Sequence, residues 1–290
     1  MSDISALAKS IPPISLICAF GGLYALGRSR LGEGRSRRGL WFYLGLVFLL
    51  AAMAAPLEIF AGRSLSAHMT QHVILLVLAP LFLVLADPWS ALLAGLPERT
   101  RNFGAQAEFV TASRSPTSRS PTSQSPATQS PATRPSAPPR PRGMTWIRMA
   151  VLVTVVQSIV MWVWHVPALY DVAVRTEGVH AFEHLSFLGA GLWFWWAVGA
   201  TGSRRNGVAA LVVFIAALPG TALGAALILA EHPWFPAYPD LQDQQVAGAI
   251  MWSVAGAVYL AGAVVLFISW LNGIESSEEG EWSTIKTQHA

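Results

Sequence analysis

Charged residues are scarce in this 290-residue chain, because Asp, Glu, Lys and Arg together make up only 12% of it. A typical soluble domain contains about 25%. Hydrophobic residues make up 53% of the chain, and the long apolar runs contain almost no charged side chains. This composition excludes an ordinary soluble protein and predicts an all-α, polytopic membrane protein. The net charge of +3 is explained by membrane topology, so we expect no nucleic-acid partner.

Cysteine and lysine are also nearly absent, and each absence removes a class of function. The single cysteine, Cys18, excludes an intramolecular disulfide and any motif built from paired thiols. The only lysines, Lys9 and Lys286, lie outside the apolar runs, which excludes a retinal Schiff base in a membrane helix. The predicted spans carry no ionisable group near the bilayer centre, and this argues against transport of ions across the membrane.

Seven apolar runs are long enough to cross a bilayer, whose hydrocarbon core requires about 20 helical residues. The predicted spans are 11–27, 40–61, 65–86, 146–166, 179–200, 207–230 and 246–271. We expect Pro80 to kink the third of them. Three of these spans precede a low-complexity segment and four follow it, so the segment divides the chain.

Arginine is concentrated in alternate loops, as expected of the cytoplasmic side of a membrane protein. The arginines of the first, third and fifth loops are Arg28, Arg30, Arg35, Arg37, Arg38, Arg99, Arg101, Arg114, Arg119, Arg134, Arg140, Arg142, Arg204 and Arg205. The intervening loops hold only Arg63 and Arg175. We therefore expect the amino terminus outside and the carboxyl terminus inside.

Residues 111–143 are rich in Ser, Pro and Thr, and a pentapeptide recurs four times from Ser115. Such a segment cannot bury a core, and it predicts a disordered cytoplasmic linker. It separates the first three spans, within residues 1–110, from the last four, within 144–272. The acidic residues 273–290 predict a solvated cytoplasmic tail.

Six of the seven histidines fall at the predicted outer ends of the spans. They are His68, His72, His165, His180, His184 and His232. His68 and His72 are four residues apart, as are His180 and His184, so each pair lies on one helix face. A single histidine at a membrane interface indicates little, but two such pairs on different helices favour a metal site.

Imidazole combined with thioether suits copper, whereas imidazoles alone also accept zinc. The predicted ligands are His68, His72, His165, His180 and His184, with Met161, four residues before His165, and His232 ranked below them. Met69 is not among them, because it points about 100° away from His68 around the helix. We expect Glu183, Gln71 and Asp243 to accept the other ring N–H of metal-bound imidazoles, with Glu183 the best placed.

Four blocks of sequence resemble the integral-membrane CtaG family, the assembly factors of caa3-type cytochrome c oxidase. They are His68-Met-Thr-Gln-His72 with Pro80, Trp164-His165-Val-Pro-Ala-Leu-Tyr-Asp171, Val179-His180-Ala-Phe-Glu183-His184-Leu-Ser-Phe187, and Asp243-Gln-Gln-Val-Ala-Gly-Ala-Ile-Met-Trp252. They occur in order over residues 40–270. The repeat linker departs from the family pattern, and the segment around His232 matches it less well.

The resemblance implies a multi-pass protein of the bacterial plasma membrane that assists the maturation of a haem–copper oxidase, and not an enzyme. We expect the histidine cluster to take copper from a donor on the outer side and release it to an oxidase subunit, with membrane lipid around the bundle. Partly exposed imidazoles at helix ends would bind copper exchangeably.

Three alternatives remain open at this point. A zinc site with Glu183 as base would make the chain a membrane hydrolase. Two facing histidines, such as His72 and His184, would suit a bis-histidine haem. A scaffold for oxidase assembly would bind no metal.

Overall fold

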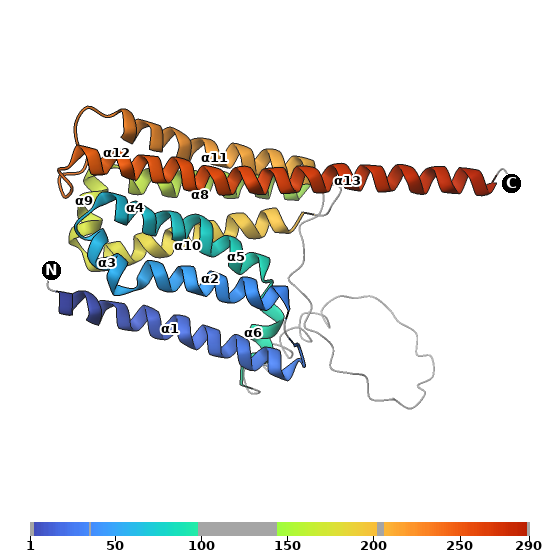
Figure 1. Cartoon of the computed structure of the whole chain (residues 1–290), viewed down its shortest axis with the longest axis horizontal. Helices are drawn as coiled ribbons and strands as arrows, with labels where there is room; N and C mark the ends of the chain where they lie inside the picture. The colour runs from blue at the N-terminus through green and yellow to red at the C-terminus, as the bar shows by residue number, and fades with distance from the viewer. Residues whose placement is uncertain (1–2, 35, 98–143, 202–205, 289–290) are drawn as a thin grey trace, which may run out of the picture.

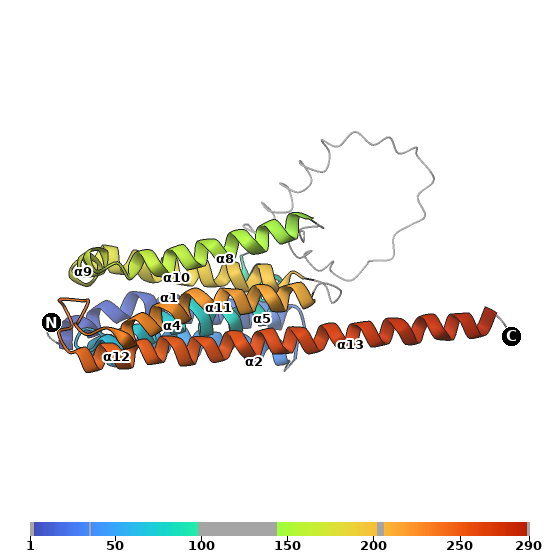
Figure 2. The ribbon, with the colours of Figure 1, turned by 90° about the horizontal axis from the view of Figure 1, so that it is seen from above.

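The computed structural model describes residues 3–34, 36–97, 144–201 and 206–288, and within these ranges every regular element is helical. The helices run side by side along the long axis of the molecule (Figure 1). Seen from above, α8 and α9 lie on one side, α12 and α13 on the other, and α4 and α11 between them (Figure 2). The predicted linker, 111–143, lies outside the described residues.

Each predicted apolar run lies in one helix or in a succession of helices. Four runs correspond to single helices: α1 (Asp3–Arg30), α8 (Met144–Trp164), α10 (Glu177–Gly199) and α11 (Asn206–Leu229). The other three are interrupted, giving α2 (Arg37–Met53) with α3 (Ala55–Ala61), α4 (Leu65–Val73) with η1 (Ile74–Leu78) and α5 (Ala79–Leu85), and α12 (Leu241–Ile250) with η3 (Met251–Ala255) and α13 (Gly256–Gln288). The short helices α6 (Trp89–Gly95) and α9 (Pro167–Arg175) lie outside the runs. Because α13 continues to Gln288, most of the predicted solvated tail belongs to the last helix.

Within the described part of the chain, five stretches are long and apolar enough to cross a membrane, and the bent pair α2–α3 makes a sixth if it is one span. Together they make the chain a multi-pass membrane protein. The helix α10 does not meet the same criterion, and its first two turns carry Glu177, His180, Glu183 and His184. The number of seven spans and the side that faces outward remain predictions.

Two interruptions have identifiable causes. The axis bends by 47° between α2 and α3, where Ala54 is extended and Pro56 begins the next helix. In the third run a π-helical turn, η1, precedes Pro80. Proline has no N–H, so the Leu76 carbonyl, four residues earlier, loses its usual helical donor. A π turn thus precedes Pro80, where the sequence predicted a kink, and Leu65–Leu85 continues as one candidate span.

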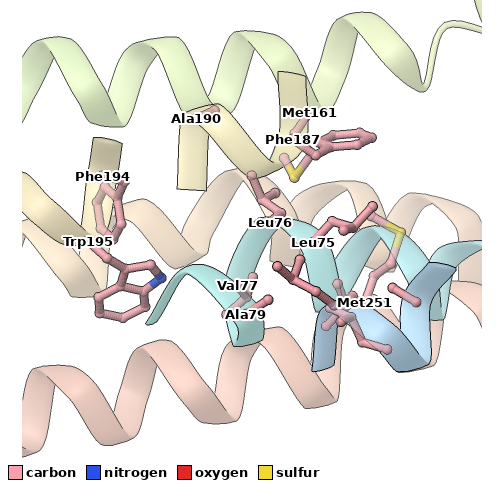
Figure 3. Close-up of a cluster of buried hydrophobic side chains, with 14 of the residues drawn as sticks. Leu75, Leu76, Val77, Ala79, Met161, Phe187, Ala190, Phe194, Trp195 and Met251 are labelled. Carbon is pink, nitrogen blue, oxygen red and sulfur yellow. The ribbon is translucent and has the colours of Figure 1, made fainter. Parts of the chain in front are cut away.

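The helix α10 packs closely against η1 at this point. Side chains of η1 meet Phe187, Ala190 and Phe194 of α10 in the buried core (Figure 3). A Cβ atom on Gly191 would overlap the Leu76 carbonyl oxygen and lie 2.8 Å from Cγ of Pro80. Only glycine allows this approach of the two backbones, which fixes how α4 and α10 face each other.

The helices α9 and α3 and the beginnings of α1, α4, α10 and α12 lie at one end of the bundle, which we call the α9 end (Figure 1). The helix α13 leads away from it, so the two chain termini lie at opposite ends.

Replacing Gly191 with Ala should destabilise the protein, because the added methyl group meets a backbone carbonyl that cannot easily move. Overpacking of this kind costs about 1–3 kcal/mol. Gly189→Ala is the matched control in the same helix, since a Cβ there meets no atom within 4 Å. We expect a lower unfolding temperature for G191A and an unchanged or higher one for G189A, measured by tryptophan fluorescence in detergent. Equal temperatures for the two variants would contradict the close packing.

Candidate metal centre

The helices α4 and α10 bring four histidines together at the α9 end. The ring centroids of His68 and His72 lie 4.5 Å apart within α4, and those of His180 and His184 lie 4.1 Å apart within α10. Between the helices, His68 lies 5.2 Å from His180, and His72 lies 5.6 Å from His184. The two i, i+4 pairs found in the sequence therefore face each other.

Two overlapping groups of side chains have the spacing of metal ligands. One ligand atom each from His68, His72 and His184 lies within 4.8 Å of the others, and the same holds for His68, His180 and Glu183. Two atoms about 2.0–2.3 Å from one ion lie at most about 4.6 Å apart, so a group whose ligand atoms all fall within 4.8 Å of one another has about the spacing that a single ion requires.

The cluster is more deeply buried than its position at helix ends suggests. His68 and His72 are each 3% exposed and His184 is 8% exposed, while His180 is half-buried. The expectation of partly exposed imidazoles is therefore wrong for every member except His180. Aromatic side chains outside the predicted ligand set cover the cluster: the ring of Tyr170 of α9 lies tilted at 5.2 Å from that of His68 and at 4.3 Å from that of Phe235.

A hydrogen-bond chain sets the tautomer of His68. The Tyr238 hydroxyl donates its only hydrogen to the Ala61 carbonyl at 2.6 Å, so it must accept from Nδ1–H of His68 at 3.1 Å. A tyrosine hydroxyl is protonated at neutral pH, and burial raises the pKa of Tyr238 further. In the neutral ring, Nε2 of His68 then carries a lone pair, and this buried atom has no hydrogen-bond partner among the described residues. The geometry leaves it available to a metal ion.

Glu183 lies beside the cluster, as its position in the sequence suggested. Its side chain is fully buried, and Oε1 lies 3.5 Å from Nε2 of His72. The structure thus places one carboxylate against the ring at the centre of the histidine group.

Two other predicted partners of the imidazoles act on the backbone instead. Asp243 accepts hydrogen bonds from Leu65 N at 2.5 Å, from Ser66 N at 3.3 Å and from the Ser64 hydroxyl at 2.9 Å, so it caps α4 from the neighbouring α12. Gln71 donates to the Ala52 carbonyl and to Glu58, both at 2.8 Å, and so ties α4 to the bend between α2 and α3. Both residues position the helix that carries His68 and His72.

The other three predicted ligands, His165, Met161 and His232, belong to neither ligand group. His165 lies at the end of α8 with its ring 5.7 Å from that of His72, and its Nε2 lies 3.1 Å from the sulfur of Met69. Met161 accepts a hydrogen bond from His165 through its backbone carbonyl, and it lines a cavity of about 40 Å³ together with His72 and His165. His232 is exposed in the loop after α11, outside both ligand groups.

The comparisons with known proteins identify the family. Residues 22–273 match the family described as cytochrome c oxidase caa3 assembly factor. The chain belongs to this family. No curated protein and no solved structure matches this assembly-factor chain. The resemblance seen in the sequence blocks is confirmed over most of the chain.

Asp243→Ala should loosen the start of α4, because three donors at that helix end lose their acceptor. Loss of a helix cap costs about 0.5–2 kcal/mol. Hydrogen exchange followed by mass spectrometry should show faster exchange in peptides that contain Leu65 and Ser66. Glu231→Ala, at an exposed position in the nearby loop, is the control and should leave these peptides unchanged. Unaltered exchange in D243A would show that α4 does not depend on this cap.

Proposed function

We propose that this assembly factor binds copper at the α9 end and passes it to a caa3-type cytochrome c oxidase during assembly. The observation that carries the proposal is the convergence of His68, His72 and His184, whose ligand atoms lie within 4.8 Å of one another, in a family of oxidase assembly factors. A haem–copper oxidase needs copper for its maturation, and imidazole is a ligand that copper accepts.

His180 gives the site a route to the surrounding solution. It is half-buried, whereas His68, His72 and His184 lie deeper, and its ring is 4.1 Å from that of His184 and 5.2 Å from that of His68. Copper delivered by a donor on the predicted outer side would meet His180 first. Exchange of one imidazole for the next would then carry the ion inward without leaving it unligated.

The alternatives find less support in the site. A porphyrin between His72 and His184 would need the space that the rings of His68, His165 and Phe187 fill. A hydrolase would need Glu183 beside a water-accessible metal, but its side chain is fully buried. A metal-free scaffold does not account for ring nitrogens of His68, His72 and His184 that are buried without hydrogen-bond partners among the described residues.

The direct test is the copper content of the detergent-purified full chain after loading and dialysis. The wild type should retain copper, and the variant with His68, His72 and His184 all changed to Ala should lose it. His232→Ala is the control, because it removes an exposed imidazole outside the cluster, and it should bind as the wild type does. Equal copper in all three proteins would overturn the proposal.

Tyr238→Phe tests the setting of the His68 tautomer. The substitution keeps the ring but removes the acceptor for Nδ1–H, so Nε2 is no longer selected as the bare nitrogen. Loss of such an orienting partner typically lowers metal affinity about 10–100-fold. We expect this loss in a competition titration with a copper chelator, and none for Tyr43→Phe, at an exposed position in α2. An unchanged affinity in Y238F would show that the tautomer of His68 does not matter for binding.

A further inference from the structure

Met69 and His165 meet inside the bundle, next to the histidine cluster but apart from its two ligand groups. Met69 is fully buried and His165 is 3% exposed. The sulfur of Met69 lies 3.1 Å from Nε2 of His165. The residues come from α4 and from the end of α8, and they are 96 positions apart in the chain.

The protonation of His165 leaves no hydrogen between these two atoms. Its Nδ1 lies 2.6 Å from the Met161 carbonyl, which can only accept, so Nδ1 carries the hydrogen. The neutral ring therefore has a lone pair at Nε2, and a thioether sulfur has no hydrogen to donate. A doubly protonated ring would place a charge in a buried site, and no acidic partner of His165 occurs among the described ion pairs.

The contact has the length of a hydrogen bond to sulfur, but with the hydrogen on Nδ1 it joins two lone-pair donors, and atoms 3.1 Å apart can bind one ion that lies to the side of the line between them. Their chemistry differs from that of the neighbouring cluster, because one donor is a soft thioether. A thioether with an imidazole selects cuprous copper, whereas a group of imidazoles also accepts zinc or cupric copper.

His72 lies between this pair and the cluster. Its ring is 5.7 Å from that of His165 and 5.6 Å from that of His184, and its nitrogens make no hydrogen bond among the described residues, although Nε2 lies 3.5 Å from Oε1 of Glu183. Phe187 packs against it at 4.5 Å and holds the ring in place. His72 is thus within reach of both groups.

We propose that Met69 Sδ and His165 Nε2 form a second, cuprous-selective site, to which His72 connects the histidine cluster. The proposal rests on the proposed copper function and adds a residue, Met69, and an oxidation state to it. Movement of the ion between the two sites is ligand exchange at His72, with no change in the charge of the copper and no external reductant.

The test is X-ray absorption at the copper edge on the full chain loaded anaerobically with cuprous copper, beside a chelator competition. The wild type should show a copper–sulfur shell. Met69→Leu, which nearly conserves side-chain volume, should lose the shell and about tenfold or more in cuprous affinity, because its soft ligand is gone. Zinc binding by the imidazoles should be unchanged. Met149→Leu, at a half-buried position in α8, is the control and should keep both the shell and the affinity.

The outcomes separate this proposal from the one on which it rests. Copper that depends on His68, His72 and His184 but shows no sulfur shell in the wild type overturns the Met69–His165 site and leaves the proposed function standing. A sulfur shell and affinity that survive in M69L overturn it equally. A wild type that binds no copper at all overturns both proposals. The wild-type spectrum by itself shows whether a sulfur shell is present, so the proposal can still be tested if M69L fails to fold.

Discussion

His68, His72 and His184 bury ring nitrogens that find no hydrogen-bond partner among the described residues. An unsatisfied buried polar atom costs about 1–3 kcal/mol, and here several lie within a few ångströms of one another. The rest of the α9 end depends on this burial of ring nitrogens. Neighbouring residues must hold each of the three rings in place without forming a hydrogen bond to its free nitrogen. A bound metal ion would satisfy these atoms, and this is why the burial supports a binding site rather than simple packing.

The supporting contacts share a pattern in which residues distant in sequence fix the backbone of α4. Asp243 of α12 caps its first turn, and Gln71 ties its second turn to Ala52, just before the bend between α2 and α3. Gly191 then allows α10 to approach the π turn that follows His72. The cap from Asp243, the hydrogen bond of Gln71 and the close packing at Gly191 all act on α4 or on the π turn that follows it. Together they determine where the imidazoles of α4 meet those of α10.

The sequence predicted the parts of this site that depend on local periodicity. The i, i+4 pairs indicated two imidazoles on each of two helices, and Glu183 was placed beside them by the same reasoning.

The sequence could not predict which helices are neighbours. Met69 was set aside because it points away from His68, yet that same direction carries its sulfur to His165 on α8. Tyr238 lies in the loop after α11 and gave no local signal, because its role depends on contact with α4 and α3. The prediction of seven spans relied on apolar runs alone. The helix α10 was counted among them, but the histidines and acidic residues that build the site make it too polar to meet the criterion for a membrane span.

We propose that the imidazoles of α4 and α10 serve oxidase assembly through copper. The most direct measurement is the copper content and activity of caa3-type oxidase purified from cells that depend on this chain, carrying either the wild type or the variant with His68, His72 and His184 changed to Ala. The account predicts that the variant, present in the membrane at wild-type level, yields oxidase deficient in copper and that added copper restores it in part. Fully metallated, active oxidase in the variant cells would contradict the account and leave the family's role in assembly without a metal step.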